Sequence, residues 1–291
     1  MFHDIYEGNI FRPPSEARSL ILQATIGCSW NRCTFCTAFA GKEFRTRTLE
    51  DIKGDVEKVY PYYKEIDKIF LADGNALCMD TDELESIVSF LYSKFSDLKR
   101  VNVYGGPIDI MKKTPEELVR LREAGLKMIY FGLESGSAEV LKRVKKGATP
   151  EMMIGAAWKV KEAKIRLSTI FILGLGGQEL SKEHAAETAK VLSSQDPDYA
   201  AALTLLLEPG APIIEEIEKG RMTLVTPEQS LGELRTIIEK MDVTGCVFRS
   251  NHPSNYVPIR GTLPYDRKQL LEQIDSAMKD FRFRPEGWRA L

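Results

Sequence analysis

The chain has 291 residues, of which 43% are hydrophobic and 28% charged, and its formal net charge is −2. This length suffices for one large domain with a full core or for two smaller ones. The balanced charge gives no basic surface for nucleic acid, and no apolar run is long enough to cross a bilayer. The first residues lack the basic-then-apolar order of a signal peptide, and an odd number of cysteines argues against a secreted disulfide framework. We therefore expect a cytoplasmic protein with reduced thiols that binds neither membrane nor nucleic acid.

Six short apolar runs alternate with amphipathic stretches over the first two thirds of the chain. The apolar runs predict strands covered on both faces, at residues 19–26, 68–72, 101–104, 128–133, 167–173 and 199–207. The amphipathic stretches predict helices at 49–64, 82–95, 114–124, 138–146, 150–163 and 182–194. Thr114 and Thr149 each stand just before a proline, which is a good helix start.

Six β–α units in series predict a parallel sheet with right-handed crossovers. A closed barrel would need two more units, and the repeat instead gives way to helices near 213–219 and 227–241. We therefore predict an α/β fold, an open (β/α)6 TIM-like partial barrel, with a doubly wound sheet as the alternative. Residues 1–225 are assigned to the barrel, with 1–17 as an outer strap, and residues 226–291 to a C-terminal extension that caps it.

The predicted strands all end in glycine and polar residues. The second runs into Ala72-Asp73-Gly74-Asn75, the fourth into Glu134-Ser135 and the fifth into 174–179. Turns favour such residues, so a single strand end of this kind means little. Six on one rim predict a binding mouth, because the carboxyl ends of barrel strands converge there and glycine lets the backbone approach a ligand closely.

Three cysteines, Cys28, Cys33 and Cys36, stand on one short loop with the spacing C-x4-C-x2-C. A structural zinc site needs four ligands, and neither His3 nor His184 has a suitable spacing for the fourth. Unliganded core cysteines are a second alternative, although the loop is rich in polar residues. Three thiolates can instead hold three corners of an iron–sulfur cube and leave its fourth iron open to a substrate or cofactor. We favour this last interpretation.

The cysteine loop, the six β–α units and the glycines at the strand ends together resemble the radical S-adenosylmethionine (SAM) superfamily. The resemblance covers most of residues 17–215. The commonest spacing in that superfamily is C-x3-C-x2-C, so this loop has one residue more. The resemblance implies that Cys28, Cys33 and Cys36 ligate a [4Fe–4S] cluster. SAM would chelate the open iron through its amino and carboxylate groups.

The resemblance also implies which residues lie along bound SAM. Phe35 matches an aromatic position near the adenine, and the carbonyls of 72–75 would accept from the amino group of SAM. Arg143 would pair with the SAM carboxylate, with a solvent-facing helix arginine as the alternative. The implied cofactor-binding residues are Phe35, Ala72, Asp73, Gly74, Asn75, Glu134, Ser135, Arg143, Ile172, Gly174 and Leu207.

The activity that the resemblance implies is reductive cleavage of SAM to a 5′-deoxyadenosyl radical, which abstracts hydrogen from a small-molecule substrate. An electron donor such as flavodoxin or ferredoxin would supply the electron. Oxidoreductase, lyase, isomerase and transferase reactions all stay open. Two alternatives are not enzymes. One is an iron–sulfur protein that senses redox state or passes electrons, and the other is a degenerate barrel that serves as an interaction or assembly module.

Residues 242–264 are dense in polar and aromatic groups, and a short strand is expected at 247–248. A solvated loop before a last helix at 265–281 is the alternative to a functional role. The candidate substrate contacts are Tyr104, Arg249, Asn251 and Asn255, and the candidate catalytic residues are His252, Tyr256 and Cys246. Cys78 and Cys246 are interpreted as small buried residues, with a fourth cluster ligand or a radical-relay thiol as alternatives.

Overall fold

The computed structural model describes residues 5–63 and 65–290. They form two compact units, each assembled from separate segments of the chain. The first unit takes the chain up to Asn31, then Ala38–Phe131 and Trp158–Leu167. The second takes Arg32–Thr37, Gly132–Ala157 and everything from Ser168 onward. The predicted boundary at 225/226 divides the chain differently and stays a prediction.

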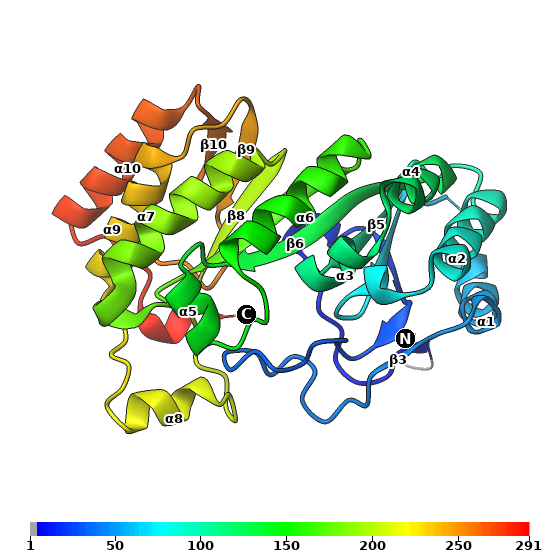
Figure 1. Ribbon diagram of the computed structural model, residues 1–291, viewed down its shortest axis with the longest axis horizontal. Coiled ribbons are helices and arrows are strands. Elements are labelled where there is room, and N and C mark those ends of the chain that lie inside the picture. Colours follow the sequence, from blue (N-terminus) through cyan, green and yellow to red (C-terminus); the bar gives the residue numbers. More distant parts are fainter. Residues whose placement is uncertain (1–4, 64, 291) are drawn as a thin grey trace. The chain divides into compact units, whose positions relative to one another are not determined.

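The first unit is built on parallel strands in the order β1-β4-β5-β6. A small antiparallel pair, β2 with β3, leads into and out of the cysteine loop. Helices α1, α2 and α4 lie side by side (Figure 1). The elements are β1 (Leu20–Gln23), β2 (Thr25–Ile26), β3 (Arg45–Thr46), α1 (Leu49–Val59), β4 (Lys68–Ala72), α2 (Thr81–Lys94), β5 (Arg100–Gly105), α3 (Pro107–Lys112), α4 (Pro115–Ala124) and β6 (Leu126–Glu134). The chain leaves this unit within β6.

The second unit pairs β7, β8 and β9 in parallel and closes with the antiparallel strand β10. Helix α9 packs between α7 and α10 (Figure 1). The elements are α5 (Ala138–Arg143), α6 (Pro150–Glu162), β7 (Arg166–Leu173), α7 (Gly177–Gln195), β8 (Tyr199–Thr204), α8 (Ile213–Glu218), α9 (Pro227–Lys240), β9 (Cys246–Ser250), β10 (Ile259–Leu263) and α10 (Arg267–Lys279). The end of α6 and the first residues of β7 belong to the first unit.

The local sequence explains most element boundaries. Helices α1, α4 and α9 each begin at a threonine whose side chain accepts from the N3 amide, while the N3 side chain accepts from the threonine amide. The strands are apolar because they are buried on both faces: β1 and β5 are almost entirely buried. All six predicted strands are present, each within three residues of the expected bounds.

The structure corrects several predicted bounds. The helix expected at 49–64 ends at Val59, because Pro61 cannot donate the next helical hydrogen bond and a 3-10 turn follows at Tyr60–Tyr62. Helix α7 starts at Gly177 rather than at residue 182, since glycine does not by itself signal a helix. The short helix α3 was missed; it begins with Pro107 in its first turn. The strand expected at 247–248 is the longer β9, which pairs with β10.

Candidate active site

In the first unit, Cys28 lies against the loop that follows β4. The Gly74 amide donates to the Gly27 carbonyl across 3.1 Å. A Cβ added at Gly74 would stand 2.7 Å from the Cβ of Cys28 and 2.9 Å from its Cα, closer than real side chains approach. Only glycine therefore fits at position 74 with the cysteine in this place. The contact joins the first cysteine to the loop that the sequence implied as a SAM-binding motif.

Asp73 ties the same two loops together through one carboxylate oxygen. Its Oδ2 accepts from the Gly27 amide at 3.1 Å, from Gln23 Nε2 at 3.3 Å and from Lys42 Nζ at 2.7 Å. The side chain of Asp73 is fully buried, and that of Lys42 is 12% exposed. The second oxygen, Oδ1, is buried without a hydrogen-bond partner among the described residues. Asp73 thus keeps one acceptor unused beside the cysteine loop.

Asn75, Ser29 and Asp109 form a second connection between the cysteine loop and the strand ends. Asp109 Oδ2 accepts from Ser29 Oγ at 3.1 Å and from Asn75 Nδ2. Asn75 Oδ1 accepts from the Gly106 amide at 3.1 Å, at the end of β5. Sequence reasoning missed Ser29 and Asp109. The network holds the residue next to Cys28 against two successive strand ends.

Cys78 lies close enough to this network for its neighbours to influence it. Burial first, and then the charge of Asp109, raise the pKa of the Cys78 thiol to about 11. Cys78 is therefore a neutral thiol at pH 7. Cys246, by contrast, is completely buried in β9 in the second unit. Cys246 is a small buried residue, as interpreted, whereas Cys78 is only partly buried, and the alternative roles of both stay predictions.

In the second unit, Cys33 and Cys36 lie in a short turn that two elements hold. The Cys36 amide donates to the Cys33 carbonyl at 3.3 Å, which closes the turn. Thr34 donates through its amide to the carbonyl of Val144, just after α5, and accepts from the amide of Ile213 at the start of α8. Both cysteines are half-buried. The turn therefore has a backbone held at both sides and two partly exposed cysteines.

Phe35, between these two cysteines, packs on an apolar cluster. The buried members of this cluster are Val140, Val144, Leu175, Ala211, Ile213 and Met222. Ile172 and Leu205 pack on the same cluster from the ends of β7 and β8. The structure thus brings Phe35 and Ile172 together, two residues that the resemblance placed along the adenine. Leu207 is 36% exposed and lies beyond β8.

Glu134 and Arg143 occupy the loop and the helix that follow β6. Glu134 has a left-handed backbone (φ 63°), and its carboxylate pairs with Lys146 at 2.9 Å. Arg143 donates to the Gly176 carbonyl at 3.1 Å and stands 3.9 Å from Glu179. Both side chains are only partly buried. Arg143 therefore contacts the loop after β7, and its pairing with a SAM carboxylate stays a prediction.

Ser135, His184 and Glu233 form a buried polar group that the sequence did not reveal. Ser135 Oγ is 2.8 Å from His184 Nδ1 and accepts from the Ser137 amide at 3.0 Å. His184 Nε2 lies 3.8 Å from a carboxylate oxygen of Glu233, on α9. Burial lowers the pKa of His184 to about 4 and raises that of Glu233 to about 7. Ser135, implied as a cofactor contact, has a fully buried side chain directed at this group.

The candidate substrate and catalytic residues of the tail lie in different surroundings. Asn255 is buried and bonds to Ala202 and Thr204 of β8, and Tyr256 OH donates to Glu286. His252 Nδ1 lies 2.9 Å from Ser254 Oγ. Arg249 and Asn251 are exposed. Asn255 and Tyr256 thus connect the tail to β8 and to the C-terminal segment, and their roles toward a substrate remain predictions.

Tyr104 and an N-terminal cavity lie in the first unit. The Tyr104 ring packs edge-on against the Phe70 ring, with 4.9 Å between the two ring centroids.

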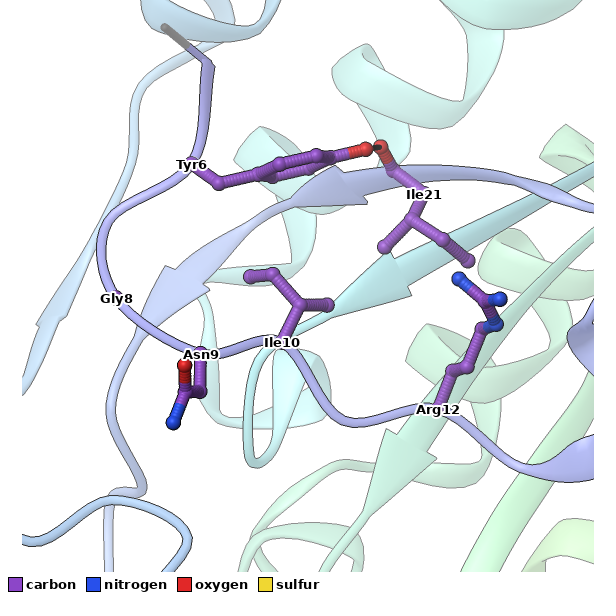
Figure 2. A pocket seen from close by; sticks show the side chains of 6 residues that line it. All are labelled: Tyr6, Gly8, Asn9, Ile10, Arg12 and Ile21. Atoms are coloured by element: carbon purple, nitrogen blue, oxygen red, sulfur yellow. Dashed lines mark hydrogen bonds between the residues drawn. The ribbon is translucent and has the colours of Figure 1, made fainter. Parts of the chain in front are cut away.

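A cavity of about 460 Å³ opens under the segment at residues 6–12, beside Ile21 of β1 (Figure 2). Its lining residues are Tyr6, Gly8, Asn9, Ile10, Arg12 and Ile21. The hydroxyl of Tyr6 donates to the Ile21 carbonyl at 2.9 Å, which anchors this segment to β1.

Comparison with known proteins identifies the family. Residues 22–189, more than half of the chain, match the family model described as the Radical SAM superfamily. The chain therefore belongs to the radical SAM superfamily, as its cysteine loop and strand ends predicted. This membership confirms a [4Fe–4S] cluster and SAM as the cofactors of the family to which the chain belongs.

Two curated relatives show how far the similarity extends. The heme chaperone HemW of Bacillus subtilis is 24% identical over 186 residues, which cover 62% of this chain and 48% of HemW. A tRNA-2-methylthio-N(6)-dimethylallyladenosine synthase of Clostridium botulinum is 28% identical over 200 residues, which cover 64% of this chain and 42% of that protein. The chain thus spans less than half the length of these relatives.

A solved structure confirms the fold. Methylornithine synthase PylB superimposes with a TM-score of 0.54 at 17% identity, covering 90% of this chain and 84% of PylB. This likeness confirms the predicted α/β class and the TIM-like partial barrel. Helices long and apolar enough to cross a membrane are absent from residues 5–63 and 65–290.

Proposed function

We propose that this protein is a radical SAM enzyme in which Cys28, Cys33 and Cys36 hold a [4Fe–4S] cluster. The observation that carries the proposal is the contact between Gly74 and Cys28, because it leaves no room for a side chain where the implied SAM-binding loop meets the first cysteine. Three half-buried thiols on one loop are the donor set that a cluster with an open iron requires.

The chemistry that the cluster and SAM supply when bound is one-electron cleavage of a carbon–sulfur bond of SAM, which gives methionine and a 5′-deoxyadenosyl radical that takes hydrogen from a substrate. The residues of this chain bind and orient the participants. The unused Oδ1 of Asp73 and the carbonyls of residues 72–75 offer acceptors to the SAM ammonium group. Phe35 and Ile172 offer an apolar surface to the adenine. Arg143 offers positive charge to the SAM carboxylate.

We propose that the substrate is a small molecule and that an external electron donor, such as flavodoxin or ferredoxin, reduces the cluster. The candidate contacts Arg249, Asn251 and Tyr104 stay part of this proposal. A cluster protein that only senses redox state is the second candidate function. It would use the same three cysteines without cleaving SAM.

Anaerobic reconstitution followed by reduction and addition of SAM tests the proposal. We expect release of 5′-deoxyadenosine, and we expect Cys33→Ala to abolish both this release and the iron and sulfide content. Ser86→Ala is the control, because that exposed hydroxyl donates only within helix α2, to the Asp82 carbonyl. A loaded cluster that releases no nucleoside in the presence of SAM would favour the sensor.

A further inference from the structure

Helix α9 carries a buried carboxylate, Glu233, that reaches the end of β7. The residue is 2% exposed. Its Oε2 accepts from the Gly174 amide at 2.7 Å, and its Oε1 accepts from Ser181 Oγ at 2.6 Å. Glu233 lies outside the residues 22–189 that match the family model. An element beyond the matched domain therefore supplies the acceptor for the first amide after β7.

Gly174 starts the loop at residues 174–177, here called the β7 loop. It has a left-handed backbone (φ 79°), and a Cβ there would stand 2.8 Å from a methyl group of Val225. The β7 loop has two further anchors: Arg143 donates to the Gly176 carbonyl, and the Gln178 amide just after it donates to the Thr223 carbonyl. Glu233 holds the beginning of the loop, next to Ile172.

The charge on Glu233 is not explained by stability alone. Burying a carboxylate is unfavourable unless a cation or many donors compensate it. Asp55 and Asp73, also buried, each pair with a cation, Arg47 and Lys42 respectively. The groups that lower the pKa of Glu233 are instead the neutral hydroxyl of Ser181 and the amide of Gly174, and neighbouring His184 is itself neutral at pH 7. What the side chain provides is an acceptor, Oε2, at a defined point of the β7 loop.

We infer that Glu233 is a positioning residue of the SAM site: its hydrogen bond to the Gly174 amide fixes the β7 loop, and with it the apolar surface that the partly buried Ile172 offers to the adenine. This inference rests on the proposed function. It makes helix α9, which lies beyond the matched domain, part of the SAM site, although no side chain of α9 need contact SAM itself.

Two substitutions at position 233 separate positioning from simple folding. Glu233→Leu keeps the volume but removes both acceptors, and Glu233→Gln keeps one oxygen that can accept from the Gly174 amide. The readouts are the dissociation constant of SAM, by equilibrium dialysis on unreduced cluster-loaded protein, and hydrogen exchange of the 173–178 amides. We expect Leu to weaken SAM binding about tenfold and to speed that exchange. We expect Gln to restore the affinity to within about threefold of wild type.

Glu16→Gln is the matched control. Glu16 is fully buried, and its Oε1 accepts from Asn102 at 2.8 Å and from Tyr130, all within the first unit. We expect this variant to keep the SAM affinity of wild type with unchanged iron content. Should Glu233→Leu fail to fold, Ser181→Ala serves instead, because it removes the hydrogen bond that orients Oε1. We expect it to weaken SAM binding about threefold.

The outcomes distinguish the inference from the proposed function. Faster exchange of the β7 loop with an unchanged SAM affinity in Glu233→Leu would overturn the inference while wild-type binding upholds the function. Hydrogen exchange of the 173–178 amides that is unchanged in Glu233→Leu would also overturn the inference. Failure of cluster-loaded wild type to bind SAM would overturn the proposed function, and the inference with it.

Discussion

The loops after β4 and β7 are both anchored by buried carboxylates, but the two anchors have opposite electrostatics. Asp73 in the first unit pairs with Lys42 at 2.7 Å, so its charge is compensated. Glu233 in the second unit accepts from an amide and a hydroxyl, and its pKa rises to about 7. Burial without a cation beside it raises the pKa of the Glu233 carboxyl group. One protein therefore holds its two implied SAM-binding loops by a carboxylate paired with a cation, the compensated anchor, and by one that titrates near neutrality, the sensitive anchor.

The largest expected effect comes from closing the space beside Cys28. Gly74→Ala places a methyl group 2.7 Å from the Cys28 Cβ, with backbone as well as side chain in the way, so the cysteine loop must move. We expect reconstituted protein to lose most of its iron and sulfide. Gly54→Ala in helix α1 is the control, since a Cβ there meets nothing within 4 Å. A full cluster in Gly74→Ala would show that the contact does not position the cysteine.

The compensated anchor can be broken by removing its cation. Lys42→Met leaves Asp73 buried without its partner, and we expect the free energy of unfolding to fall by about 3 kcal/mol. Urea denaturation of wild type and of Lys42→Met measures this loss of unfolding free energy. The comparison variant is Lys53→Met, which breaks an exposed pair with Glu50 and should cost below about 1 kcal/mol. Equal losses in Lys42→Met and Lys53→Met would show that Lys42 does not compensate the buried charge of Asp73.

The network beside the compensated anchor should matter somewhat less. Asp109→Leu leaves the Ser29 hydroxyl without its acceptor and leaves Asn75 Nδ2 with Ser29 Oγ alone, and we expect a loss of about 2 kcal/mol in the free energy of unfolding. Lys112→Met removes only an exposed partner of Asp109 and should change stability by less than about 0.5 kcal/mol. A loss in Asp109→Leu no greater than that in Lys112→Met would argue against the network.

The smallest expected effect is a change of the free energy of unfolding with pH, and it comes from Glu233, the sensitive anchor. Because the folded pKa of Glu233 is raised to about 7, the folded state binds a proton that the unfolded state has already lost, and stability falls as the pH rises through 7. His184, with a folded pKa of about 4, acts in the opposite sense, and because the unfolded-state imidazole is still about half protonated at pH 6.5 it offsets part of this loss. Between pH 6.5 and 8 we expect wild type to lose ~0.4 kcal/mol of unfolding free energy.

Glu233→Gln should flatten this part of the slope, because the amide does not titrate. Urea denaturation of wild type and variant at pH 6.5 and at pH 8 provides the measurement. Parallel slopes in the two proteins would mean that Glu233 is not the group that titrates.

The sequence predicted what is local and missed what is distant. The strands follow from continuous apolar runs, and the cysteines, Phe35 and the strand-end glycines follow from spacing. Asp109 and Glu233 could not be found in this way. Their partners lie far along the chain, as with Gly174, 59 positions before Glu233. Each is an ordinary acidic residue of an amphipathic helix until the fold places it against a backbone amide or a neighbouring loop.

The predicted helix bounds failed where backbone chemistry, rather than periodicity, decides the end. Pro61 ends α1 early, and glycine at 177 begins α7 although glycine usually predicts a loop. Ser135 shows the same limit for the site. Its place after β6 suggested a ligand contact, but only the structure shows that its hydroxyl faces the buried His184.

The capping box at Thr226 and Gln229 that starts α9 has a practical consequence for anyone who transplants this barrel into another protein. A cut at the predicted boundary, just ahead of that threonine, would carry over the three cysteines of the loop and every residue of the family match. It would leave behind the acceptor of the Gly174 amide, so the graft would need a substitute, such as a designed acidic helix, to keep the adenine side of its pocket in shape.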